Sequence, residues 1–176
     1  IVEYVDASFA TCALVWCLGM AVKARYHSTG KADLPLTCSL PGGVGGRSGR
    51  QPSQGGGVWF ANVPGIKLVC TTTPAYVRYF LKASVMDDDP VVFFFSRTAA
   101  MSIKEDVDPA DQSIPALTNA AKVVKEGADL TLVAWHRPLI YATEFVAEPE
   151  AETGKTVAII DPRVLCPFDE EKVYAS

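Results

Sequence analysis

The chain has 176 residues, of which 49% are hydrophobic and 20% charged, and its formal net charge is −4 at pH 7. This balance is ordinary for a globular α/β protein with a substantial core, and it argues against a general nucleic-acid-binding protein. The length fits one domain, two small domains or parts of two.

In chain order, the hydrophobic pattern first predicts a strand over residues 1–5 and a long helix over about 7–27. The run 7–22 carries no charge, but it is shorter than the roughly 20 apolar residues of a membrane-spanning helix. We therefore expect no membrane span, and instead a helix that is buried on all sides and needs covering on every face. A strand over 34–40 follows, and then a glycine-rich loop over 41–57.

The glycine-rich loop carries no familiar nucleotide-binding motif. It has no GxxxxGK[ST] sequence, and Gly43, Gly45 and Ser48 miss the GxGxxG pattern by one residue. Ordering so many glycines costs backbone entropy, so we expect a mobile loop or one that wraps a ligand. Ser53 and Gln54 could hydrogen-bond a ligand there, although such residues usually satisfy backbone groups.

Residues 63–90, VPGIKLVCTTTPAYVRYFLKASVMDDDP, contain the most informative pattern in the chain. They predict a buried strand over 66–72, a helix that starts at the Thr-Pro pair of 73–74 and ends near Met86, and an acidic turn. A second buried strand over 91–95 follows. This strand–helix–strand unit implies a parallel sheet with helices on its faces.

The second half of the chain begins after residues 104–115, whose composition is that of an interdomain linker. The predicted elements there are strands over 120–124, 130–134 and 155–160, a helix over 139–147, an acidic loop over 148–154 and a terminal helix from about Asp169. His136 and Arg137 lie at the end of one strand, where α/β proteins often bind ligands. We expect His136 to be a helix-entry or surface residue rather than a catalyst.

The five cysteines are odd in number, widely spaced and without a CxxC pair. The chain has only two histidines, so we expect no zinc site. Most of the cysteines lie in apolar runs, which favours reduced, buried thiols and a cytosolic or matrix compartment.

Several motifs, in this order, resemble the β subunit of the thiamine-diphosphate-dependent decarboxylating component of 2-oxo acid dehydrogenase complexes, of the pyruvate or branched-chain type. They are the strand at 1–5, QPSQGGGVWF at 51–60, PGIKLV, TPAYVRYFLKA and DDDPVVFF within 64–94, DLTLVAWHR at 129–137 and DPRVLCPFD at 161–169. The resemblance covers essentially the whole chain.

The resemblance implies an α/β fold with two parts. The first, residues 1–104, is most of a parallel-sheet, thiamine-binding pyrimidine-type domain that lacks its front. A linker over 105–118 leads to the second part, residues 119–176, which is the first half of a transketolase C-terminal-type domain.

The chain departs from the family pattern at several positions. The histidine of the family's QHSQ motif lies at the cofactor, and here that position is Pro52, which has no acid–base group and no backbone N–H. An Asp-Gln pair and an Asn in the family's helix correspond to Val15, Trp16 and Gly19. The glutamate that activates the cofactor lies upstream of the first strand, so we expect it to have no counterpart in a chain that begins at Ile1. We expect a processed product, a fragment or a partial record.

The resemblance also implies two ligand contacts. It places Phe9 where the family stacks an aromatic ring on the aminopyrimidine of the cofactor, and the alternative is a core phenylalanine. It places a potassium-type ion at the acidic turn, and the alternative is a solvated turn. An ion would relieve the repulsion among three adjacent aspartates. The implied ion ligands are Leu36, Ser84, Val85, Asp87 and Asp89.

The implied function is oxidative decarboxylation of pyruvate or a branched-chain 2-oxo acid, with acyl transfer to a lipoyl group. The implied partners are an α subunit that holds the cofactor diphosphate through magnesium, a second β copy and a lipoyl acyltransferase core, in the mitochondrial matrix or the bacterial cytoplasm. The alternative, which Pro52 favours, is a catalytically dead paralogue that serves as a structural or assembly subunit.

Overall fold

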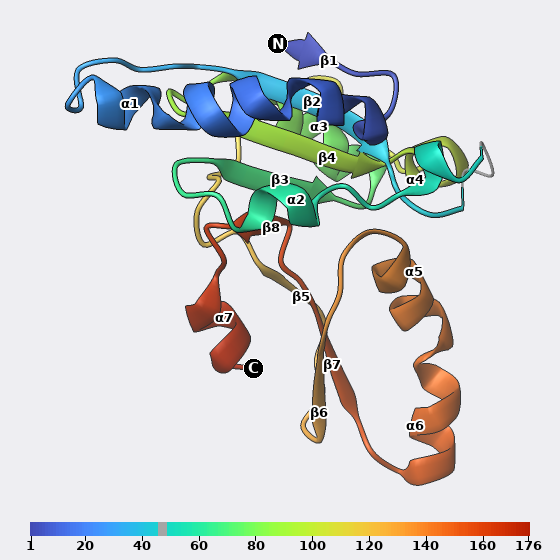
Figure 1. Ribbon diagram of the computed structural model, residues 1–176. Helices are drawn as coiled ribbons and strands as arrows, with labels where there is room; N and C mark the ends of the chain where they lie inside the picture. The colour runs from blue at the N-terminus through green and yellow to red at the C-terminus, as the bar shows by residue number, and fades with distance from the viewer. Residues whose placement is uncertain (46–48) are drawn as a thin grey trace.

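The computed structural model describes residues 1–45 and 49–176, and of Pro52 it describes the backbone alone. Its larger sheet has five strands in the order β1-β2-β4-β3-β8 (Figure 1). The strands are β1 (Val2–Glu3), β2 (Thr37–Gly42), β3 (Lys67–Thr71), β4 (Val91–Ser96) and β8 (Val164–Cys166). The first four run parallel and β8 runs antiparallel to β3, so the predicted, mostly parallel sheet is confirmed.

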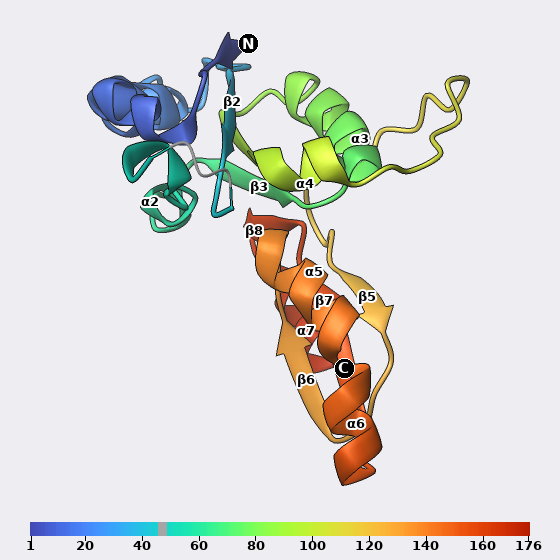
Figure 2. The same ribbon diagram turned by 90° about the vertical axis from the view of Figure 1, so that its right-hand side faces the viewer.

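Helices cover both faces of this sheet (Figures 1 and 2). On one face lies α3 (Pro74–Val85), with the short α4 (Arg97–Ser102) beside it, and on the other lie the N-terminal helical segments and α2 (Val58–Ala61). Thr73 precedes α3 with an extended backbone, and Pro74 occupies the first turn, where a missing N–H costs no helical hydrogen bond. The predicted strand–helix–strand unit is therefore confirmed.

The central strand β4 has hydrophobic cover on both faces. Val92 and Phe94 pack with the N-terminal helices and α2, whereas Val91 and Phe93 pack with α3. A strand buried on both faces needs a continuous apolar run rather than an alternating one, which explains why the sequence VVFFF was recognisable as this strand.

The N-terminal helix is broken, whereas the sequence predicted one long helix over 7–27. It consists of the 3₁₀ helix η1 (Ala7–Ala13), the π-helical η2 (Val15–Met20), the 3₁₀ helix η3 (Ala21–Lys23) and α1 (Ala24–His27). A bend of 60° separates η1 from the rest, and a π turn inside a helix is a known cause of such kinks. Among the described residues, no single helix is long and apolar enough to cross a membrane. Within the same part of the chain, only η1 taken together with the bent segment Val15–His27 has the length and apolar composition of a membrane span.

This chain alone buries only part of the surface of these helical segments, so the expected cover on every face stays a prediction that requires partner chains. Ala7, Ala10 and Val22 face the core. Val15 and Trp16, however, are 76% and 68% exposed. The exposed apolar side chains form what we call the outer face: Phe9, Val15, Trp16 and Met20.

The second part of the chain forms a smaller sheet in the order β5-β7-β6 (Figure 2). Its strands are β5 (Lys122–Lys125), β6 (Leu130–Val133) and β7 (Val157–Asp161). Strand β6 is parallel to β7, and the helices α5 (His136–Phe145) and α6 (Ala147–Thr153) connect them. The terminal helix α7 (Glu170–Tyr174) follows Asp169, close to the predicted start. The Asp169 side chain caps the helix by accepting the Lys172 N–H.

Three elements correct the sequence interpretation. Residues 148–154 were expected to be an acidic loop, but most of them form the helix α6. The helix tolerates Pro149 because this residue lies in its first turn, and it ends at Gly154, whose backbone is left-handed. Helix α4 was not predicted. Strand β8 was not predicted either, and it joins the larger sheet although it follows the smaller one in the chain. The domain boundaries at 104 and 119 stay predictions.

All five cysteines are free thiols, but they are not all buried. Cys38 and Cys70 are buried as expected, whereas Cys12 is exposed. The sulfur atoms of Cys17 and Cys38 lie 4.0 Å apart, and the hydrogen bond between the two thiols lowers the pKa of Cys17. Cys17 and Cys166 are half-buried, so the expectation of buried thiols holds for Cys38 and Cys70 and is wrong for Cys12.

The outer face predicts that the chain associates with itself or with a partner, because its four large apolar side chains, all at least 47% exposed, are costly to leave in water. We expect light scattering at micromolar concentration to show an oligomer or aggregate. The double substitution Val15→Lys with Trp16→Glu should reduce the particle mass measured by light scattering. Tyr174→Glu, at an exposed aromatic residue on α7, should leave that mass unchanged. A stable monomer of the unsubstituted chain would contradict this prediction.

Candidate functional site

A cavity of about 440 Å³ lies at the carboxyl ends of β2 and β4. The chain leaves β2 toward α2 on one face of the sheet and leaves β4 toward α4 near the other. Two adjacent parallel strands with such opposite connections form the kind of crevice in which open α/β sheets bind ligands. The lining includes Val44, Phe94 and Ser96 from the first part of the chain, and Trp135 and His136 from the second.

Glycines let the loop backbone approach the floor of this cavity. A Cβ atom on Gly42 would lie 2.9 Å from the Phe94 ring and 3.0 Å from the Ala7 side chain. Any larger residue at position 42 would therefore displace Phe94 or Ala7. The Ser53 hydroxyl donates to the carbonyl of Gly49 at 2.8 Å, and the Gln54 carbonyl accepts the Gly43 N–H. Both contacts satisfy the backbone of the loop. Ser48 lies outside the described residues.

His136 joins the two parts of the chain at this cavity. It is 7% exposed, and its ring stacks on Phe94 with the centroids 4.6 Å apart. Its backbone N–H donates to the Thr72 hydroxyl at 2.8 Å. The φ angle of 55° is left-handed, and histidine tolerates this conformation better than most residues do. The expectation of a helix-entry residue is confirmed, because α5 starts here, but the surface alternative is wrong.

The hydrogen bond of the ring fixes the chemistry of His136. Its Nε2 lies 3.2 Å from the Phe94 carbonyl oxygen, which can only accept, so Nε2 carries the proton. Burial lowers the pKa of His136 to about 4, so the ring is neutral at pH 7. Nδ1 is then an acceptor, and it lies 3.8 Å from the position that a Cβ atom on Gly43 would occupy. The cavity therefore contains one buried imidazole able to accept a proton or a hydrogen bond.

Phe9 is not among the described residues that line this cavity. Phe9 lies in η1 and is 47% exposed, so the alternative of a core phenylalanine is wrong for this chain. The backbone of Pro52 lies in the short 3₁₀ helix η4 (Gln51–Ser53), and its side chain is outside what the structure describes. Asp6 holds the start of η1, because its carboxylate accepts the Ser8 N–H at 3.0 Å and lies 3.4 Å from the Arg97 guanidinium.

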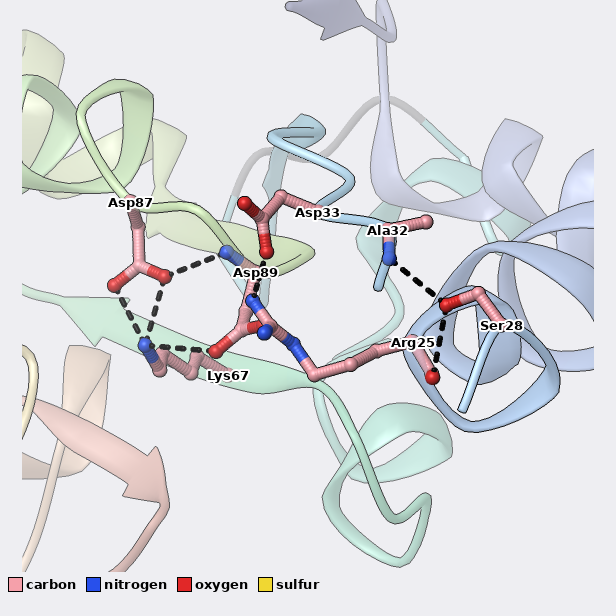
Figure 3. A network of polar contacts seen from close by, with 7 residues as sticks. All are labelled: Arg25, Ser28, Ala32, Asp33, Lys67, Asp87 and Asp89. Carbon is pink, nitrogen blue, oxygen red and sulfur yellow. Dashed lines mark hydrogen bonds and ion pairs between the residues drawn. The ribbon is translucent and has the colours of Figure 1, made fainter. Parts of the chain in front are cut away.

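The acidic turn after α3 is held by two cationic side chains (Figure 3). Both carboxylate oxygens of Asp87 lie 2.7 Å from the Lys67 ammonium. The carboxylate of Asp89 accepts from Arg25 Nε at 2.8 Å and lies 3.5 Å from the same ammonium. Arg25 also reaches Asp33 at 2.7 Å. Repulsion among the aspartates is therefore offset by Lys67 and Arg25.

The expected carbonyl ligands of the ion also have protein partners. The Ser84 carbonyl accepts from the Thr37 hydroxyl at 2.8 Å, and the Leu36 carbonyl accepts the Val91 N–H at 2.8 Å. Each carbonyl oxygen keeps a second lone pair for another contact. Among the residues the structure describes, no group of three or more His, Cys, Asp or Glu side chains is arranged to hold a metal ion. The potassium site stays a prediction.

The buried His136 predicts a loss of stability in acid. Its pKa is about 4 in the folded chain and about 6.5 when unfolded, so between these values the unfolded chain binds more protons. Stability should fall as the pH drops from 6.5 to 4, by roughly 3 kcal/mol for this group. Urea unfolding at pH 7.5 and pH 4 measures the loss. His136→Asn, which keeps a residue that tolerates positive φ, should lose less, and an equal loss in both proteins would contradict the prediction.

Comparison with known families matches both parts of the chain. Residues 1–102 match the family described as the transketolase pyrimidine-binding domain, and residues 119–176 match the transketolase C-terminal domain. Among solved structures, one described as a split-gene transketolase, an inactive β4 tetramer, superposes with a TM-score of 0.73 at 20% identity, over 97% of this chain and 51% of the other. At that identity the match shows the fold alone.

Curated relatives are β subunits. The mitochondrial 2-oxoisovalerate dehydrogenase subunit beta of Dictyostelium discoideum is 35% identical over 157 residues, which is 89% of this chain and 42% of that protein. The pyruvate dehydrogenase E1 component subunit beta of Acholeplasma laidlawii is 36% identical over 156 residues, again 89% of this chain and 47% of the relative. The chain spans about half the length of these relatives or somewhat less.

The resemblance and fold inferred from the sequence are thereby confirmed. The chain belongs to the transketolase pyrimidine-binding domain family, continues into part of a transketolase C-terminal domain, and is similar to the β subunits of 2-oxo acid dehydrogenases.

Proposed function

We propose that the chain is the β-subunit portion of the decarboxylating component of a 2-oxo acid dehydrogenase complex. Its reaction is the oxidative decarboxylation of pyruvate or a branched-chain 2-oxo acid, with acyl transfer to a lipoyl group. The partners in this proposal are an α subunit, a second β copy and a lipoyl acyltransferase core, in the mitochondrial matrix or the bacterial cytoplasm. The observation that carries it is the 35% sequence identity to the 2-oxoisovalerate dehydrogenase subunit beta over 157 residues, which include both parts of the chain.

The exposed ring of Phe9 fits the proposed cofactor, thiamine diphosphate. Asp6 and Arg97 hold the start of η1, and the Phe9 ring is 47% exposed there, so a flat heteroaromatic ring can stack on it. When bound, the cofactor supplies the carbon nucleophile and the electron sink for decarboxylation. This chain would position its aminopyrimidine end, and the partner α subunit would hold the diphosphate through magnesium.

Proton transfer is the part of the chemistry for which the chain is least equipped. Position 52, where the family has histidine, is Pro52, and proline can neither donate nor accept a proton. Val15, Trp16 and Gly19 replace the polar residues of the family helix. In this proposal the missing groups come from the assembled partners.

A second function is a structural or assembly subunit without catalytic activity. The substitution at Pro52 favours it, and so does the outer face, because Val15 and Trp16 present apolar surface where the family has an Asp-Gln pair. Such a subunit would keep the β fold and the contacts with its partners while a paralogue catalyses the reaction.

Co-expression with the α subunit of a 2-oxo acid dehydrogenase distinguishes the two functions. We expect the two chains to copurify, and the pair to reduce an artificial electron acceptor when pyruvate or 2-oxoisovalerate, thiamine diphosphate and magnesium are present. Copurification without turnover would support the assembly subunit, and a failure to copurify would contradict both functions.

The chain by itself is expected to be inactive, and Pro52→His should not restore activity on its own. Val15, Trp16 and Gly19 remain in that variant, and the diphosphate still lacks the partner that holds it. The same acceptor assay measures both proteins without the α subunit. Turnover by the unsubstituted chain alone would contradict the roles assigned to these positions.

The acidic turn would add a potassium ion to this assembly, bound by Leu36, Ser84, Val85, Asp87 and Asp89. Potassium in place of tetramethylammonium at equal ionic strength should raise the melting temperature, because an ion at ten times its Kd stabilises by about 1.4 kcal/mol. Lys67→Met should enlarge the difference, since the Lys67 ammonium competes for both carboxylates. Identical melting curves in both salts, for both proteins, would exclude a specific site.

A further inference from the structure

Two cysteine thiols lie in contact between the N-terminal helical segments and the larger sheet. Cys17 belongs to η2 and Cys38 to β2, and their sulfur atoms are 4.0 Å apart although the residues are 21 positions apart in the sequence. A disulfide bond is about 2 Å long, so the two sulfur atoms need only approach each other by a similar distance. The fold therefore brings together two thiols that could be linked covalently.

The two thiols differ in their access to solvent. Cys38 is buried, with 4% of its surface exposed, whereas Cys17 is half-buried. Cys17 also lies in the π-helical η2, and π turns inside helices occur frequently at functional sites. A small reagent from solvent therefore meets Cys17 before Cys38.

Hydrogen bonding prepares Cys17 for ionisation. The hydrogen bond with the Cys38 thiol lowers the pKa of Cys17, burial raises it, and the hydrogen bond with the Tyr4 hydroxyl lowers it again, so that the net shift is downward. The pKa of Cys38 is raised by the same hydrogen bond and by burial. Because the thiolate rather than the thiol is the nucleophile, Cys17 is the sulfur that reacts first.

Two other cysteines show what distinguishes Cys17. Cys70 is 0% exposed, and burial raises the pKa of its thiol. Cys166 is half-buried, as Cys17 is, but burial raises its pKa as well. Exposure alone therefore does not set Cys17 apart, whereas its contact with the Cys38 thiol does.

We propose that Cys17 and Cys38 are an oxidisable dithiol site, at which a hydroperoxide forms a disulfide that links η2 to β2. The Cys17 thiolate attacks one peroxide oxygen, the O–O bond breaks, and the departing oxygen takes up a proton while Cys17 becomes a sulfenic acid. The Cys38 sulfur then attacks the Cys17 sulfur, the S–O bond breaks, and the hydroxide leaves as water with the Cys38 proton. The two thiols lose two electrons in total, which reduce the peroxide.

The disulfide would connect the helix to the sheet beside the outer face. Cys17 directly follows Trp16, so the link would fix that part of the outer face relative to β2. Disulfides in reducing compartments are usually transient and serve catalysis or redox sensing, which fits a pair of free thiols held in contact. This site goes beyond the proposed function and does not depend on it, because it needs neither the α subunit nor thiamine diphosphate.

Oxidation of the full chain with hydrogen peroxide tests the proposal. Cys12 and Cys17 lie on one tryptic peptide, because the first lysine or arginine is Lys23, so Cys12→Ser is the starting protein. We expect mass spectrometry to find the peptides of Cys17 and Cys38 linked, and dithiothreitol to separate them. The linked protein should melt roughly 5–10 °C higher than its reduced form, because the disulfide restricts the unfolded chain.

Further substitutions in the Cys12→Ser protein assign the two roles. Cys38→Ala should stop the reaction at the Cys17 sulfenic acid, which dimedone labels, whereas Cys17→Ser should give neither the disulfide nor a label at position 38. Cys166→Ser removes another half-buried thiol and should leave the yield of the disulfide unchanged. The disulfide in the starting protein is measured with both thiols in place, so a folding defect in a variant cannot hide it.

Three results would overturn the proposal. The first is the absence of a Cys17–Cys38 disulfide in the folded starting protein at a peroxide concentration that oxidises free glutathione. The second is a disulfide from either residue to Cys70 or Cys166 in its place. The third is dimedone labelling of Cys38 in Cys17→Ser that equals the labelling of Cys17 in Cys38→Ala.

Discussion

Burial of β4 on both faces is the constraint on which the rest of the structure depends. Because Val92 and Phe94 need cover on one side and Val91 and Phe93 on the other, the chain must place helices on both sides of the sheet. The strand then ends at Ser96 between the two helical layers. The ring of its Phe94 stacks on the ring of His136 from the second part of the chain. The core and the cavity are therefore parts of one packing arrangement.

The elements that the sequence predicted well are those whose pattern is local. The strand β4 is an unbroken apolar run, and α3 begins at a Thr-Pro pair, so both could be recognised from a few adjacent residues. The break after Ala13 could not, because the residues of η1 and η2 are all compatible with an α-helix and only packing decides their turns. Strand β8 is short and pairs with a strand almost a hundred residues earlier, which no local pattern reveals.

The candidate site shows the same division. The sequence identified His136 as a helix-entry residue, but its burial depends on Phe94, which is 42 residues away. It also identified the aspartates of the acidic turn, whereas the cations beside them come from other segments, Lys67 from 20 residues and Arg25 from 64 residues earlier. A run of like charges therefore showed where the charge lies and not what balances it. The contact between the Cys17 and Cys38 thiols could be found only from coordinates.

Strand β8 has a consequence for how the protein is made. It covers the edge of β3, with the Cys70 N–H donating to the Arg163 carbonyl at 2.8 Å beside the strand pair. During synthesis, the other strands of the larger sheet leave the ribosome well before residues 164–166, so β3 presents an open edge in the meantime. Open edges pair readily with other chains. The nascent first part is thus exposed to strand-to-strand association until residues 164–166 arrive, and slow translation of the intervening residues would lengthen that exposure.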